Sequence, residues 1–114
     1  MMWGVEPVAT SKEYLSYILD QLSSVDGITH RGMMGEYTLY INGRLAAYLC
    51  DDRLLIMPLP AAQRLLPNAP REAPYPGAKD MLLVEETDDA DFLVRLFEDI
   101  YPELPAPKAK KSGS

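Results

Sequence analysis

The sequence predicts an α+β fold in which helices pack on a mostly antiparallel sheet. Three observations predict this class: apolar residues at helical spacing near both ends of the chain, an Asn-Gly turn between two strand-like segments, and a proline-rich interval before a further strand. The expected order is one helix, three or four strands, a short helix, one or two strands and a last helix. Residues 1–104 form the predicted domain, and residues 105–114 form a predicted disordered tail containing lysines.

The first predicted helix covers about residues 11–24, where apolar residues recur at helical spacing. Thr10 and Glu13 have the spacing of a capping box, in which the hydroxyl accepts an N3 amide and the glutamate reaches back. Asp26-Gly27 follows, and glycine suits the left-handed conformation after a helix end.

A β-meander is predicted next, with strands at 28–34, 36–41, 44–50 and 53–57. Asn42-Gly43 is a strong hairpin signal, because a type I′ turn needs positive φ at both central residues. The turn predicts three cross-strand pairs: Ile41 with Arg44, Leu39 with Ala46, and Tyr37 with Tyr48.

Both faces of this meander are rather apolar. The first predicted face holds Tyr37, Leu39, Ile41, Ala46, Tyr48, Leu55 and Met57. The second holds Tyr40, Leu45, Ala47, Leu49, Leu54 and Ile56. A sheet with one solvated face should alternate more cleanly. Two interpretations stay open: cover on both sides, by helices and the proline-rich loop, or a surface for self-association or a partner.

The second half predicts a short helix at about 60–66, a loop at 67–77 with four prolines and a glycine, and a strand within 79–86. Thr87 and Asp88 are the expected caps of the last helix, near whose start acids favour the helix dipole. Its apolar stripe is Leu93, Leu96, Phe97, Ile100 and Leu104.

Composition and charge exclude several classes of function. The chain is 47% hydrophobic and 25% charged, as in globular proteins, and no apolar run is long enough for a membrane helix. The N-terminus lacks the pattern of a signal peptide, and a single cysteine fits a reducing cytoplasm. All 17 acids but only eight of the 11 bases lie in residues 1–104, so this part carries a charge near −9. Such a body disfavours direct binding of nucleic acid.

The sequence offers no catalytic residues, no metal ligand set and no cofactor motif. Cys50 stands beside two aspartates, which raise a thiol pKa and favour a structural role. One histidine and one cysteine cannot supply the usual zinc ligands. Asp51-Asp52 fits a turn.

One segment carries the candidate interaction or ligand patch. Gly32-Met33-Met34-Gly35 lacks the lysine and hydroxyl residue of a phosphate loop, and core filling by the methionines is the simpler interpretation. The alternative is an adaptable binding patch assisted by cationic groups, if the fold gathers them. The full candidate set is His30, Arg31, Gly32, Met33, Met34, Gly35, Tyr37, Arg53 and Lys79.

Several of these pieces resemble the short TfoX/Sxy-type proteins built on a TfoX N-terminal domain: "RGMMGEYTLY", the turn at Asn42-Gly43, "DDRLL" and "YPGAKDMLLVEE". The resemblance covers about residues 11–104. It implies a two-layer α+β fold like that of secretion chaperones, and a link to competence regulators that act in transcriptional control through a partner protein. It implies no catalytic residues.

The leading hypothesis is a cytoplasmic, non-enzymatic protein-interaction domain with a regulatory role. It would act through an apolar sheet face, by self-association or with a protein partner, or through residues 31–37. The alternative is a small-molecule or anion-binding module that uses residues 31–37 with Arg53 and Lys79. Direct DNA binding is the third and least favoured.

Overall fold

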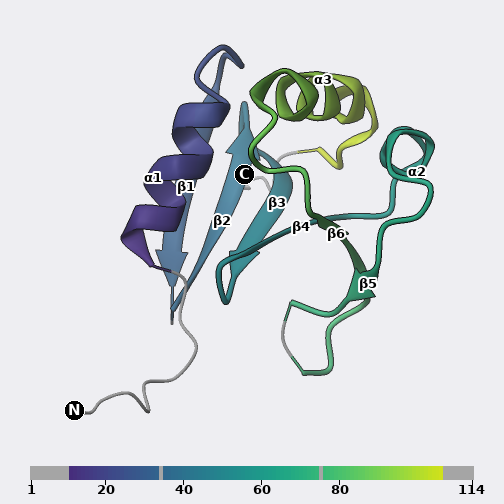
Figure 1. Cartoon of the computed structure of the whole chain (residues 1–114), viewed down its shortest axis with the longest axis horizontal. Coiled ribbons are helices and arrows are strands. Elements are labelled where there is room, and N and C mark those ends of the chain that lie inside the picture. Colours follow the sequence, from purple (N-terminus) through teal and green to yellow (C-terminus); the bar gives the residue numbers. More distant parts are fainter. Residues whose placement is uncertain (1–10, 34, 75, 107–114) are drawn as a thin grey trace, which may run out of the picture.

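The fold has two layers, with helices on one face of a single sheet (Figure 1). A computed structural model describes residues 11–33, 35–74 and 76–106. Over these residues the elements are α1 (Lys12–Gln21), β1 (Ile28–Met33), β2 (Glu36–Ile41), β3 (Arg44–Cys50), β4 (Arg53–Ile56), α2 (Pro60–Leu65), β5 (Arg71–Glu72), β6 (Met81–Val84), α3 (Ala90–Ile100) and the 3-10 helix η2 (Tyr101–Glu103). The predicted fold class and element order are confirmed.

The sheet is antiparallel throughout and has the strand order β1-β2-β3-β4-β6-β5. Strands β1 to β4 form the predicted meander in chain order. The chain then leaves the sheet through α2 and returns as β5, which pairs with β6. Strands β1 and β5 are therefore the two edges of the sheet.

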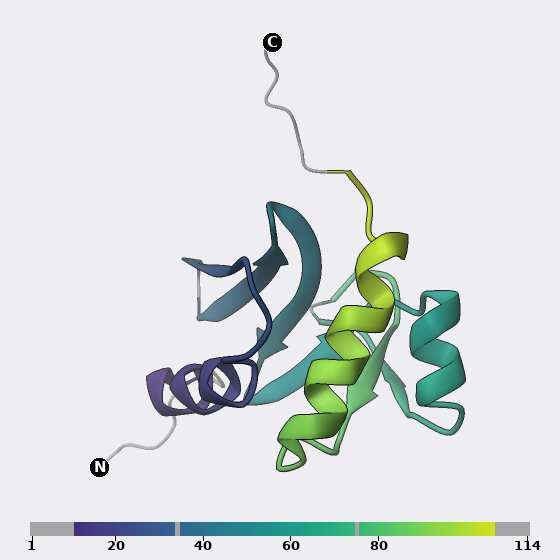
Figure 2. The same ribbon diagram turned by 90° about the horizontal axis from the view of Figure 1, so that it is seen from above.

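The main core lies between the sheet and the helices α1 and α3 (Figures 1 and 2). Its largest side chains are fully buried, among them Ile18 of α1, Leu39 and Leu54 of the sheet, and Phe97 of α3. Burial of each such side chain stabilises the fold by about 1.5–3 kcal/mol relative to exposure. The predicted apolar stripe of α3 is entirely buried here, which confirms it. Helix α2 adds Ala61 and Ala62.

Helix α1 is shorter than predicted and begins at another cap. The Ser11 hydroxyl accepts a hydrogen bond from the Tyr14 amide, at 3.1 Å, so Ser11 is the N-cap. With this cap Glu13 is not the N3 residue, and the predicted capping box is wrong; Thr10 lies outside the described residues. The helix ends at Gln21, and Gly27, with φ of +82°, lies later, in the turn that enters β1.

Helix α3 also begins later than predicted. Asp89, instead of Thr87 or Asp88, is the N-cap, and its carboxylate accepts from the Phe92 amide at 3.1 Å. The Thr87 carbonyl instead accepts hydrogen bonds from the Tyr17 hydroxyl and the Gln21 side chain, at 3.0 and 2.8 Å. These bonds tie α1 to the connection between β6 and α3.

The hairpin of β2 and β3 starts in the predicted register and then leaves it. Asn42 has the positive φ that the turn requires, and Ile41 pairs with Arg44. Beyond this point a β-bulge shifts the pairing, so that Leu39 lies opposite Ala47 and Ala46 is the extra residue. The predicted pairing of Leu39 with Ala46 is therefore wrong.

The bulge also reverses the faces predicted for β3. Tyr37 lies opposite Leu49, and Tyr48 lies opposite Thr38, so the predicted pair of Tyr37 with Tyr48 is wrong. A shift of one residue moves every following side chain to the other face of a strand. Ala47 and Leu49 consequently face the helices and are fully buried, and each predicted face mixes residues from both sides of the sheet.

The face turned away from the helices carries a smaller apolar cluster. Cys50, Leu55 and Met81 are buried there, with Tyr48 and Met57 packed beside them. The proline-rich segment before β6 lies over part of this face, as Pro74 and Met57 line one pocket. Cover on both sides is thus the arrangement found over β3 and β4. The predicted loop at 67–77 contains the short strand β5. The expected order allowed one or two strands in this half of the chain, but not at these residues.

Neither end of the chain adds a described element. No helix in the described ranges has the length and apolar character needed to cross a membrane. The predicted disordered tail falls outside these ranges, apart from residues 105 and 106.

Candidate functional site

Three residues of the candidate patch meet on the helix-covered face of the sheet, at its β1 edge. His30 and Gly32 belong to β1, and Gly32 lies opposite Tyr37 of β2. The His30 and Tyr37 rings make an edge contact, with centroids 6.1 Å apart. A Cβ atom on Gly32 would come within 2.9 Å of the Tyr37 ring. The absence of a side chain at Gly32 therefore leaves space for this ring. The ring also packs against the main core.

Arg31 points to the opposite side of the sheet. Successive side chains of a strand alternate between faces, so Arg31 cannot share a face with His30 and Gly32. Its cross-strand partner is Thr38, and Arg31 is exposed. Met33 closes β1 and Gly35 has the positive φ of the tight turn that follows, at +85°. The prediction for Met34 lies outside the described residues.

Arg53 begins β4 and is engaged with its own neighbours. Its guanidinium forms an ion pair with Glu72 of β5 and donates a hydrogen bond to the Cys50 carbonyl at 3.3 Å. The ion pair joins β4 to the strand beyond β6, so Arg53 helps to hold the short edge of the sheet. Its charge is thereby balanced within the fold.

Lys79 lies in the segment before β6, where it lines an apolar pocket. Strands β2 and β3 separate β1 from β4, so Arg31 and Arg53 lie on strands three places apart in the sheet. The structure therefore brings His30, Gly32 and Tyr37 together and leaves Arg31, Arg53 and Lys79 at three other places. The gathering of cationic groups on which the ligand hypothesis depended does not occur.

Cys50 is buried and holds its proton firmly. Its thiol donates to the Glu36 carboxylate at 3.5 Å. Burial, followed by the charge of Glu36, raises the pKa of the Cys50 thiol to about 12. The predicted direction is confirmed, although the neighbouring Asp51 is the smallest of the causes. A thiol of this kind is a poor nucleophile at neutral pH.

The strand β1 presents a row of backbone groups at the edge of the sheet. The Asn42 amide donates to the Gly27 carbonyl at 2.9 Å, in register with the β1–β2 ladder. Hydrogen-bonded and non-hydrogen-bonded pairs alternate in an antiparallel ladder, so the amides of Thr29 and Arg31 point towards β2. Those of His30 and Gly32, with that of Ile28, point outwards. No strand among the described residues pairs with this outer side.

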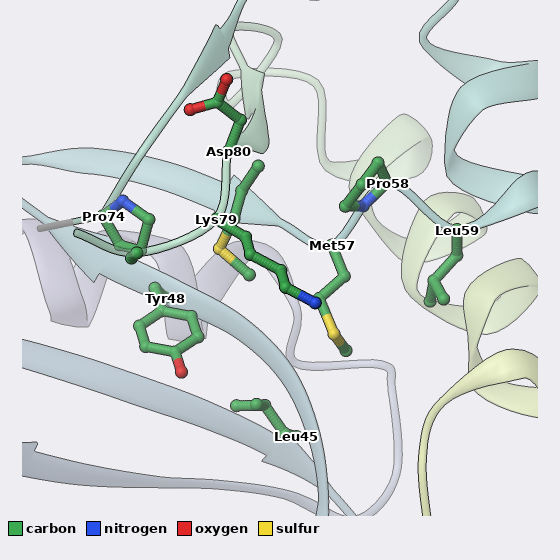
Figure 3. Close-up of a pocket in the computed structure, with 10 residues that line it drawn as sticks. Leu45, Tyr48, Met57, Pro58, Leu59, Pro74, Lys79 and Asp80 are labelled. Atoms are coloured by element: carbon green, nitrogen blue, oxygen red, sulfur yellow. The ribbon is translucent and has the colours of Figure 1, made fainter.

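The pocket beside Lys79 has a volume of about 370 Å³ (Figure 3). It lies between the segment before β6 and the sheet face that the helices leave uncovered. Its apolar lining includes Leu45, Tyr48, Met57, Pro74 and Met81. The bulge at Ala46 contributes to this lining, because it places Tyr48 on the uncovered face. This volume falls at the lower end of the range usual for small-molecule sites.

Within the described ranges, no group of three or more His, Cys, Asp or Glu side chains is placed to hold a metal ion.

Comparison with known proteins places the chain among relatives. The sequence is 32% identical over 106 residues to the "Uncharacterized 12.7 kDa protein in trpE 5'region" of Spirochaeta aurantia, and the match covers 92% of each chain. The chain belongs to the family of that protein. That relative is uncharacterised, so the match assigns no activity.

The other comparisons give no further assignment. No model of a known protein family matches the chain, and no solved structure matches it. The TfoX/Sxy resemblance and the likeness to secretion chaperones therefore stay predictions.

Two features of this family member were not predicted from the sequence. The β1 edge could have been identified in part, since a first strand followed by a meander often lies at an edge. The pocket could not, because Leu45, Met57 and Lys79 are far apart in the sequence. Only the bulge and the return of the chain through β5 bring them together.

Proposed function

We propose that this chain is a non-enzymatic, cytoplasmic protein-interaction domain whose β1 edge accepts an extended segment of a partner protein. The observation that carries the proposal is the outward row of amides and carbonyls on β1, which no described strand satisfies. A peptide that adds a strand gains main-chain hydrogen bonds along such an edge. Thr29, His30, Arg31 and Gly32 are all exposed, so the edge is accessible.

The length of the edge supports this role. Strand β1 has six residues, whereas the opposite edge strand has two. Proteins commonly blunt their exposed edges with short strands, prolines or charges, because a long free edge invites pairing. Arg31 is the one charged side chain within β1 besides the titratable His30. A six-residue edge gives a partner three outward-facing residues to pair with, at Ile28, His30 and Gly32.

The charge around β1 indicates the chemistry of the partner. Arg31 carries the one full positive charge of this strand, in a body whose charge is near −9 (17 acids and eight bases). An extended segment with little negative charge of its own pairs with the strand through its main chain and avoids the repulsion that nucleic acid would meet. We therefore propose an extended segment of a protein with little net negative charge as the partner.

The regulatory part of the proposal is supported by the resemblance to the TfoX/Sxy proteins. The longer members of that family are competence regulators that act through a partner protein. The non-enzymatic part of the proposal is supported by Cys50, whose raised thiol pKa removes it as a nucleophile at neutral pH. The cytoplasmic location is supported by this single, unpaired cysteine.

A ligand module built from residues 31–37 with Arg53 and Lys79 has less support. Arg31 and Tyr37 lie on opposite faces, and Arg53 is paired with Glu72. Of these residues, Lys79 alone adjoins the apolar pocket.

The test is capture of partners from lysate of the source organism by wild-type protein, His30→Pro and His30→Ala. Proline at position 30 removes an outward amide and blocks strand addition, yet it leaves the bonds of Thr29 and Arg31 to β2. We expect wild type and His30→Ala to retain the same protein and His30→Pro to lose it. Light scattering after size-exclusion chromatography, applied to the same variants, detects a second copy as the partner.

Retention of the partner by a folded His30→Pro protein would contradict the proposal. So would a strictly monomeric wild type that captures nothing. Thermal melting of both variants shows that each is folded before capture is compared.

A further inference from the structure

The pocket on the face of the sheet turned away from the helices is separate from the β1 edge and has its own chemistry. Leu45 and Tyr48 come from β3, Met57 follows β4, and Pro74 comes from the segment before β6. Beside them lies the buried cluster of Cys50, Leu55 and Met81. The hollow therefore has apolar walls beside a buried part of the sheet, at the scale of a small molecule of about 370 Å³ or less.

The charge at this pocket comes from Lys79. Figure 3 shows its side chain lying across the hollow, with the ammonium group on the side of Met57. The carboxylate of the neighbouring Asp80 is directed away from the apolar side chains in the same view. The ion pairs of the described residues join Arg53 with Glu72 and Arg95 with Asp99, so neither engages Lys79. One cation thus faces an apolar hollow.

We infer that this pocket binds a small apolar molecule carrying a single carboxylate. The apolar body would displace water from Leu45, Tyr48 and Met57, and the carboxylate would pair with the Lys79 ammonium. Burial of the body stabilises the complex in proportion to the apolar area removed from water. Lys79 is exposed in the free protein, and the attraction of its ammonium group for an anion strengthens as the ligand excludes solvent.

The charge of the ligand is limited by the rest of the protein. The chain carries a net charge of −6, which repels polyanions such as nucleotides over a longer range than one lysine can offset. A monoanion loses little by this repulsion. A neutral analogue of the same shape would fill the pocket equally well but would leave the Lys79 ammonium without a partner.

The test compares acids with neutral and cationic analogues of the same shape. Octanoate, 1-octanol and octylamine, and likewise 3-phenylpropionate and 3-phenylpropanol, are titrated into the full chain and followed by methyl NMR. We expect the acids to bind about tenfold more tightly than the alcohols, and the amine to bind most weakly. The shifts are expected at the methyl groups of Leu45, Met57 and Met81.

Two variants and a matched control separate the contribution of the Lys79 charge from that of the apolar walls. Lys79→Met should remove the preference for acid over alcohol, while Lys12→Met, a matched change of an exposed lysine on α1, should leave it intact. Ala78→Phe, which fills the pocket, should abolish saturable binding of all five compounds. Equal affinities of acid and alcohol for the wild type would overturn the inference. An unchanged preference in Lys79→Met, or no saturable binding of either acid at millimolar concentration, would do the same.

Discussion

The two edges of the sheet are built in opposite ways. Strand β5 has two residues, and its Glu72 is held by the ion pair with Arg53, while the Leu83 amide donates to the Pro70 carbonyl just before it, at 2.9 Å. Strand β1 has six residues and ends in a tight turn, and its outward amides have no described strand beside them. One edge is short and fastened by side chains, whereas the other is long and open.

The difference between the two edge strands shows which of them can pair with another chain. A short, tethered strand offers few groups for pairing with another chain, and β1 offers a complete row. The helices leave that row accessible, because α1 and α3 cover the face of the sheet and not its side (Figure 2). Because a fold that needed only stability would not require a long unpaired edge, the open edge of β1 indicates a binding role.

The largest effect is expected from proline at the inward-facing positions of β1. Thr29→Pro removes an amide that bonds to β2 and leaves its partner carbonyl unsatisfied, which should destabilise the fold by about 1–3 kcal/mol. His30→Pro should cost under about 1 kcal/mol, because the amide that it removes points outwards. Chemical denaturation of both variants measures the difference. Equal losses of unfolding free energy in the two variants would show that both amides are in equivalent positions, and would contradict the description of β1 as an open edge.

The helices and strands were predicted from the sequence far better than the face of the sheet on which each residue lies. Asn42-Gly43 gave the hairpin and the apolar stripe gave α3, since both are local patterns of period and turn chemistry. The bulge at Ala46 was not predicted, because an extra residue in a strand leaves no mark in an already apolar segment. Every later assignment of a residue on β3 to a face then failed.

The residues of the candidate patch lie at separate places for a simpler reason. Neighbouring residues in a strand point to opposite faces, so His30 and Arg31 could not form one patch with their side chains. The ion pair of Arg53 was also beyond prediction, since Glu72 lies in a segment whose prolines indicated a loop. The segment that contains His30 and Arg31 is still central to the proposal, because the backbone groups of β1 form the open edge.

A smaller effect is expected at Cys50, which lies between the two edges and opposite Glu36 in the ladder. Its thiol pKa is raised from 9.0 to about 12 in the folded protein. Well below pH 9.0 the thiol is protonated in both states and adds no pH dependence. As pH rises above 9.0, the unfolded chain loses this proton first, so stability falls until the folded pKa is reached.

Between pH 8 and pH 10 this loss should amount to about 1 kcal/mol. Cys50→Ala should show a shallower decline over the same interval when the free energy of unfolding is measured in urea. Identical slopes for the variant and the wild type would contradict the raised thiol pKa.

The smallest effect is expected at the fastened edge. Arg53→Ala and Glu72→Ala should each cost under about 1 kcal/mol, because both side chains are about one-third exposed, at 31% and 36%. A double-mutant cycle isolates the coupling between them, and faster amide exchange at Leu83 should report the loosened edge. A coupling well above this range would mean that the short edge depends on the ion pair far more than its exposure indicates.

The most direct measurement of the central claim is amide hydrogen exchange along β1 in the free protein. The open edge predicts that His30 and Gly32 exchange quickly while Thr29 and Arg31, bonded to β2, stay protected. Equal protection of all four amides would show that the outer side of β1 is already occupied, and would contradict its assignment as the docking edge.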